Sequence, residues 1–309
     1  MALDMDHLET RLFAAAFGSL LPLPTKLEPH LEEALRHVLN HPGTLVRPRL
    51  VFEMALAYGL ESGHARDLAV SLEYFHTASL IFDDLPCMDN AQKRRGAPCV
   101  HVAFGDATAI LAALALINRA YALSWRAVAG APQERQTRAL AYIERRLGVE
   151  GLLNGQSLDL RYSTLPHDRR TTQRVANDKT VSLIRLPLIL PAMLGGASES
   201  ELQLLERLAL SWGLSYQIVD DLKDVLQNSE ETGKTVARDS SLDRPNLVLA
   251  IGIPAAVERL TRLIERGDKA LERLIEQRPA IRFLKKLRHD LNSESTRVAQ
   301  SACATRGPA

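Results

Sequence analysis

Two short acidic clusters contain the side chains best suited to chemistry. Each cluster pairs two aspartates and adds a third a few positions later: Asp83, Asp84 and Asp89 in DDLPCMD, and Asp220, Asp221 and Asp224 in DDLKD. On an α-helix, which turns about 100° per residue, Asp220 and Asp224 lie about 40° apart. Neighbouring carboxylates repel one another unless a cation binds between them, and oxygen ligands favour hard ions such as Mg²⁺. Both clusters are therefore candidate magnesium sites.

The first cluster cannot lie on one face of a regular helix. Asp89 would fall about 240° around the helix from Asp83. Pro86 stands between them, and because proline breaks a helix we expect the chain to bend there and return Asp89 toward the metal. The alternative interpretation is that each cluster is only a solvated helix end. Two clusters of the same form, each after an apolar stretch, favour the metal sites.

Basic residues near both clusters could bind the phosphate groups of a substrate. Arg94 and Arg95 follow the first cluster, Lys179 precedes the second, Lys234 follows it, and Arg47 stands directly before a proline. Arginine binds phosphate oxygens in a bidentate manner, and lysine meets them as a point charge. A single basic residue is usually a solvated surface charge, but adjacent arginines directly after an acidic cluster indicate a diphosphate site.

The elements that must hold these residues are predicted to be helices. Apolar residues recur at three- and four-residue spacing in Leu27–Leu39, Pro48–Tyr58, Ala65–Phe82, Ala107–Val128, Gln133–Leu153 and Glu199–Leu226. Ser198 and Glu201 form a predicted capping box at the start of the last helix. Alternating, strand-like segments are absent. We expect one all-α domain over residues 1–309, with a tail that frays from about Ser293 and a polar segment, Gln227–Pro245, that could cover bound phosphates.

Composition excludes several other classes of protein. The chain has 309 residues, 46% hydrophobic and 24% charged, and a net charge of +1, so no global charge favours nucleic acid. The acidic start lacks the pattern of a signal peptide, and the longest uncharged apolar segment, Ala107–Ile117, is too short to span a bilayer. Three irregularly spaced cysteines predict neither a disulfide framework nor a zinc site. We expect a cytoplasmic protein without stable membrane insertion.

Five sequence blocks, in order, resemble the trans-isoprenyl diphosphate synthases, and among them the geranylgeranyl and farnesyl diphosphate synthases. HTASLIFDDLPCMDN followed by RRG is similar to the family's first aspartate-rich motif with two extra residues, and QIVDDLKD is similar to the second. HVAFG, GQSLD and the Lys-Thr pair match further blocks. The resemblance runs from about Gly43 to Gly252. It implies a bundle of long helices around a deep central cavity, and a homodimer.

The resemblance also implies a role for each matching residue. About three magnesium ions per active site, held by the six aspartates, would bridge an allylic prenyl diphosphate. Direct ligands of that diphosphate would be Arg94, Lys179 and Lys234, with Arg244 near the position of the family's second loop lysine. Ligands of isopentenyl diphosphate would be Arg47, His76 and Arg95. Residues that face the developing cation would be Thr180 and Gln217, which join Asp83, Asp84, Lys179 and Asp220 as catalytic residues.

The activity implied is magnesium-dependent ionisation of the allylic diphosphate and 1'-4 condensation of the cation with isopentenyl diphosphate. Ala78 and Ser79, one turn before the first cluster, are small, which suggests a deep well and a C20 product, with C15 possible. Thr44 and Leu45 replace the family's Lys and Arg, which weakens the acceptor site. Two alternatives therefore stay open: a divergent, terpene synthase-like enzyme that ionises without efficient elongation, and a non-catalytic regulatory subunit of a prenyl synthase.

Overall fold

A computed structural model describes residues 12–227 and 244–304 of the chain, with side chains described as far as residue 301. By its internal contacts the chain divides into two compact units, Met1–Gln136 and Thr137–Ala309. The prediction of a single domain over residues 1–309 stays a prediction.

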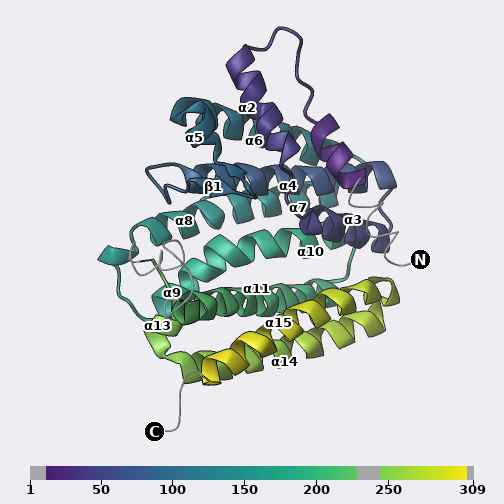
Figure 1. Cartoon of the computed structure of the whole chain (residues 1–309). Coiled ribbons are helices and arrows are strands. Elements are labelled where there is room, and N and C mark those ends of the chain that lie inside the picture. The colour runs from purple at the N-terminus through teal and green to yellow at the C-terminus, as the bar shows by residue number, and fades with distance from the viewer. Residues whose placement is uncertain (1–11, 228–243, 305–309) are drawn as a thin grey trace, which may run out of the picture. The chain divides into compact units, whose positions relative to one another are not determined.

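The first unit is built from helices and one very short hairpin (Figure 1). In chain order its elements are residues 12–19, α2 (Pro29–Asn40), α3 (Val46–Ala57), α4 (Ser62–Asp84), β1 (Lys93–Arg94), β2 (Ala97–Pro98), α5 (Val100–Phe104) and α6 (Asp106–Val128). Helix α4 packs against both α3 and α6. Because it is covered on several sides, α4 is apolar around most of its circumference.

Polar contacts fix α4 against its neighbours. The Ser71 hydroxyl donates to the Ala120 carbonyl of α6 at 2.8 Å, and the Tyr74 hydroxyl donates to the Phe17 carbonyl at 2.5 Å. Both side chains are buried, and a buried hydroxyl without a partner would be costly. These contacts set the rotation of α4 about its own axis, and that rotation decides where the aspartates at its end point.

The hairpin holds the two adjacent arginines. Lys93 pairs with Pro98 and Arg94 with Ala97, which leaves Arg95 and Gly96 as a two-residue turn. Both turn residues have positive φ, +52° and +80°, as a type I′ turn requires. A non-glycine residue pays on the order of 1–2 kcal/mol for this backbone conformation. The turn therefore keeps Arg95 in a strained conformation, which is a common feature of functional sites.

The second unit is also helical. Its elements are α7 (Gln133–Leu147, which begins at the end of the first unit), α8 (Leu152–Leu160), η1 (Tyr162–Thr164), α9 (Arg169–Ala176), η2 (Asn177–Val181), α10 (Ser182–Leu194), α11 (Glu199–Gln227), α13 (Leu247–Ile251), α14 (Ile253–Gln277), η3 (Pro279–Phe283) and α15 (Leu284–Ala304). Helices α11, α14 and α15 lie side by side (Figure 1). Leu214, Ile218 and Leu260 belong to the core between α11 and α14.

The all-α prediction is confirmed, and most predicted helices begin and end within a few residues of the observed ones. The capping box is confirmed too, since the backbone N–H of Ser198 donates to Glu201 and that of Glu201 donates to the Ser198 hydroxyl. The predicted helix Gln133–Leu153 is wrong at its end, because α7 stops at Leu147 and α8 starts only after Gly151.

The C-terminal prediction is also wrong. The segment expected to fray from about Ser293 is helical as far as Ala304. Ser295 and Val298 are buried, and Val298 packs against the α11–α14 core. Burial of an apolar face stabilises this helix beyond what its polar sequence suggests.

Helix α6 is the one helix in the described part of the chain that is long and apolar enough to cross a membrane, judged by length and composition. The prediction from sequence counted only the uncharged segment Ala107–Ile117 and so underestimated the length of the apolar helix. The apolar pattern continues past Arg119. Its buried positions, such as Leu116 and Leu123, pack within the first unit.

Candidate active site

The end of α4 brings the first acidic cluster together. The helix stops at Asp84, and Leu85 is extended, as expected for a residue before proline. The chain then turns back, so that the backbone N–H of Asp89 donates to the Asp83 carbonyl at 2.9 Å. The predicted break at Pro86 and the return of Asp89 are confirmed. Asp83 and Asp89 are both half-buried.

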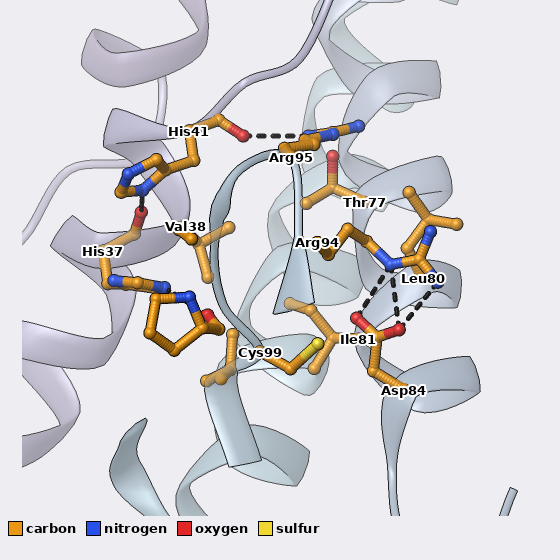
Figure 2. A pocket seen from close by; sticks show the side chains of 13 residues that line it. His37, Val38, His41, Thr77, Leu80, Ile81, Asp84, Arg94, Arg95 and Cys99 are labelled. Atoms are coloured by element: carbon orange, nitrogen blue, oxygen red, sulfur yellow. Dashed lines mark hydrogen bonds and ion pairs between the residues drawn. The ribbon is translucent and has the colours of Figure 1, made fainter. Parts of the chain in front are cut away.

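Asp84 is held by Arg94 of the hairpin. Arg94 Nε lies 2.9 and 2.8 Å from the two carboxylate oxygens, and Nη2 lies 2.6 Å from Oδ1 (Figure 2). Asp84 is only 3% exposed. Burial opposes the charge of Arg94, but the hydrogen bonds and charge of Asp84 raise the pKa of the guanidinium. Both oxygens of Asp84 are thus engaged by protein, which argues against its predicted role as a metal ligand.

The predicted ligands of isopentenyl diphosphate gather around Glu73. Arg47 Nη1 lies 3.4 Å from Glu73 Oε2, and Arg95 Nη2 lies 3.5 Å from Oε1. Arg95 Nη1 also donates to the His41 carbonyl at 3.0 Å (Figure 2). Burial raises the pKa of Glu73, and the two arginines partly offset this. Two arginines that are far apart in sequence are therefore neighbours.

His76, one turn after Glu73, is neutral. Burial, followed by the charges of Arg47, Arg95 and Arg94, lowers its pKa to about 2. Its Nδ1 atom is buried and makes no hydrogen bond to the part of the protein that the structure describes. A neutral imidazole beside three guanidinium groups can donate or accept one hydrogen bond from a bound phosphate.

The hairpin also closes a small cavity of about 50 Å³ against α2 and α4, lined in part by Thr77, Asp84, Arg94, Arg95 and Cys99 (Figure 2). That volume suits water rather than a prenyl chain.

The two residues predicted to set product length lie on α4. Ala78 is fully buried, whereas Ser79 is half-buried and donates its hydroxyl proton to the His76 carbonyl at 2.8 Å.

In the second unit, Lys179 and Thr180 lie in a single π-helical turn, η2. Such turns are rare and frequently mark functional sites. Lys179 Nζ lies 2.6 Å from Asp159 Oδ2, and Arg244 Nη1 lies 3.4 Å from the same oxygen. Gly155 allows the close approach of α8, because a Cβ atom there would lie 2.2 Å from the backbone nitrogen of Lys179. The predicted phosphate ligands Lys179 and Arg244 therefore share one buried carboxylate.

A chain of hydrogen bonds links η2 to the second acidic cluster. The Thr180 hydroxyl donates to Gln217 Oε1 at 2.8 Å, and Gln217 Nε2 donates to Asp221 Oδ1 at 2.8 Å. The other oxygen of Asp221 accepts from the backbone N–H of Leu247 at 2.7 Å. Asp221 is fully buried, so its placement argues against direct metal ligation.

The other two aspartates of the second cluster are more accessible. Asp220 is exposed and Asp224 is half-buried. In both clusters, therefore, the second aspartate is buried, while the first and third are more exposed. Lys234 lies outside the described residues.

The donor set suits magnesium rather than a metal held by protein alone. Within residues 12–227 and 244–304, no three His, Cys, Asp or Glu side chains converge tightly enough to hold an ion. Magnesium usually takes only one or two carboxylates and completes its six ligands with water and substrate phosphates. Asp83 and Asp89 in the first cluster, and Asp220 and Asp224 in the second, could each supply such carboxylates.

Sequence reasoning missed two carboxylates, Glu73 and Asp159. Each binds two basic residues that were themselves predicted as phosphate ligands. The available signal was an isolated acidic residue within an otherwise apolar stretch, as in LEYFHTASLIF. A buried charge of this kind requires an ionic or hydrogen-bonding partner.

Comparison with known proteins shows which family the chain belongs to. The family model described as polyprenyl synthetase matches residues 28–278. A geranylgeranyl diphosphate synthase of Pseudescherichia vulneris is 36% identical, over 81% of this chain and 80% of that protein. The chloroplastic geranylgeranyl pyrophosphate synthase of Capsicum annuum is 35% identical, over 79% and 67% respectively.

Solved structures are similar over nearly the whole chain. The geranyltransferase of Helicobacter pylori, solved in complex with magnesium and isoprenyl diphosphate, has a TM-score of 0.77 and 27% identity, and the match covers 96% of this chain and 97% of that one. Family model, relatives and structures agree. The chain belongs to the polyprenyl synthetase family.

Proposed function

We propose that the protein is a magnesium-dependent, short-chain prenyltransferase that condenses an allylic diphosphate with isopentenyl diphosphate. The observation that carries this proposal is the end of α4. There the turn after Pro86 brings the backbone of Asp89 back to Asp83. Arg94 donates hydrogen bonds to Asp84, the residue next to Asp83. Metal ligands and a phosphate ligand thus meet at one helix end, as a metal-bound diphosphate requires.

The aspartates divide into two groups in this proposal. Asp83, Asp89, Asp220 and Asp224 are assigned to the metal ions, about three in number, because they are the more exposed aspartates of each cluster. Magnesium supplies Lewis-acid catalysis when bound, by neutralising the charge of the leaving diphosphate. Asp84 and Asp221 orient Arg94 and Gln217 instead.

Phosphate binding is assigned to the basic residues around these carboxylates. Arg94, Lys179 and Lys234 bind the allylic diphosphate, with Arg244 beside Lys179 on Asp159. Arg47, His76 and Arg95 bind isopentenyl diphosphate. Thr180 and Gln217, already hydrogen-bonded to each other, orient oxygen atoms toward the cation.

The product is proposed to be geranylgeranyl diphosphate. Ala78 and Ser79 are small residues one turn before the first cluster, where a larger side chain would limit the length of the prenyl chain. Both curated relatives described above are named geranylgeranyl synthases. The presence of both aspartate clusters supports a catalytic protein over a regulatory subunit. Arg47 and Arg95, held together at Glu73 as a candidate acceptor site, support elongation over ionisation alone.

A homodimer through α6 is part of the proposal. Leu111, Leu114, Tyr121 and Trp125 are all exposed and lie within about 80° of one another around the helix. A contiguous apolar face of this kind marks an interaction surface. Trp125→Glu should convert the protein to a monomer in analytical ultracentrifugation, and an unchanged mass would exclude this face. Cytoplasmic location stays a prediction.

The function is tested by incubating purified protein with Mg²⁺, labelled isopentenyl diphosphate and, separately, dimethylallyl, geranyl and farnesyl diphosphates. Labelled C20 diphosphate, lost on addition of EDTA, is the expected result. Release of diphosphate without incorporated label would instead identify an ionising enzyme. An inert protein that changes the output of a partner synthase would identify a regulatory subunit.

A further inference from the structure

We propose that Glu73 is the positioning residue of the acceptor site, holding Arg47 and Arg95 together so that both can bind one diphosphate. This inference rests on the assignment of those arginines in the proposed function. Glu73 itself does not contact substrate in this proposal. It acts only through the two guanidinium groups.

The geometry assigns one carboxylate oxygen to each arginine. Arg47 approaches Oε2 at 3.4 Å and Arg95 approaches Oε1 at 3.5 Å. The Glu73 side chain is 3% exposed, whereas those of Arg47 and Arg95 are 26% and 21% exposed. The carboxylate is thus buried between the two arginines, whose side chains stay partly exposed to a ligand.

Two neighbouring guanidinium groups repel each other. Burial lowers the pKa of Arg95, the charge of Glu73 opposes this, and the charges of Arg94 and then Arg47 lower it further. A carboxylate between them offsets that repulsion before substrate arrives. Arg95 has two further constraints. It donates to the His41 carbonyl, and its guanidinium lies so close to Gly43 that a Cβ atom there would be 2.6 Å from Nε.

The sequence makes Arg47 and Arg95 more important for binding the acceptor diphosphate. Thr44, which follows the Gly43 that lies against Arg95, carries no charge, so the arginines cannot share the acceptor diphosphate with a lysine at that position. His76 adds a neutral group only. Positioning of the two arginines should therefore control the affinity for the acceptor.

Glu73→Gln is the informative substitution. Glutamine keeps the shape of glutamate but has one acceptor oxygen, and its NH₂ group can only donate. It can hold one guanidinium and must turn the other away. Loss of one charge-assisted contact corresponds to about a 10- to 100-fold weaker interaction. We expect the KM for isopentenyl diphosphate to rise by about that factor, while kcat and the KM for the allylic substrate stay within about twofold.

Glu53→Gln is the matched control. Glu53 lies on α3, in the same unit, and accepts from Arg49 Nε at 2.7 Å. Its substitution removes the same charge and should leave all three kinetic constants unchanged. Glu73→Asp keeps the charge and both oxygens on a shorter side chain, so it should give an intermediate KM. This second variant also tests the proposal if the glutamine variant folds poorly.

Calorimetric binding of isopentenyl diphosphate provides a readout that needs no turnover. Weaker binding of isopentenyl diphosphate by Glu73→Gln than by the wild type would support the role of Glu73. If the wild type binds isopentenyl diphosphate but forms no elongated product, the proposed elongation activity is refuted and the role of Glu73 is not. An unchanged or tighter Kd, or equal losses in both substrates' KM values, would overturn the positioning role.

Discussion

His76 should make the stability of this protein depend on pH in a defined window. Its folded-state pKa is about 2, because burial and then the charges of Arg47, Arg95 and Arg94 disfavour the imidazolium. The unfolded chain titrates near pH 6.5. Between these values the unfolded state binds the extra proton, so stability is lost as pH falls below about 6.5 toward the folded-state pKa.

The magnitude follows from the unfolded state alone, since folded His76 stays neutral at pH 5. The unfolded histidine is about one-quarter protonated at pH 7 and nearly fully protonated at pH 5. The linkage relation then gives a loss of about 2 kcal/mol from this one residue. His76→Gln, which cannot be protonated, should lose about 2 kcal/mol less than the wild type over the same interval.

Urea unfolding at pH 7 and pH 5, followed by circular dichroism, measures both differences. Other titrating groups contribute to wild type and variant alike and cancel in the comparison. Equal pH dependence of the two proteins would refute the conclusion that His76 stays neutral in the folded protein at pH 5. It would also remove the reason to treat His76 as an uncharged partner for the acceptor diphosphate.

Further outcomes follow from the site. Asp83→Ala and Asp220→Ala should each abolish turnover and leave the far-ultraviolet circular dichroism unchanged; normal rates would exclude both as metal ligands. Gly155→Ala should cost about 1–3 kcal/mol in urea unfolding and most of the activity, since its Cβ meets backbone of the π-helical turn; the control Gly18→Ala, with open space around it, should not destabilise. Ser79→Phe should shorten the product in a chromatographic assay, and an unaltered C20 product would exclude this residue as part of the cavity floor.

Local signals in the sequence were sufficient for the helices and several of their ends. Ser198 and Glu201 cap α11 reciprocally, as their spacing predicts. Pro86 ends α4 because the residue before proline avoids the helical conformation. Such features depend on a few neighbouring residues, so they can be deduced without knowledge of the fold.

Features that depend on contacts between distant residues could not be predicted from the sequence. The π-helical turn at Asn177–Val181 has no periodicity of its own over five residues, and its position depends on the close approach of Gly155. Asp84 and Asp221 looked equivalent to their neighbours in sequence. Only their burial separates them from the more exposed aspartates of the same clusters.

The turn at Arg95 and Gly96 has a wider consequence for how this enzyme can vary. Two consecutive arginines leave one tight bend in divergent directions, one to Asp84 and the other to Glu73. The backbone, and not the chemistry of identical side chains, decides which anion each will meet. A change in that bend would disturb donor and acceptor recognition at once, so natural variation should preserve its two-residue length even where the flanking strands diverge.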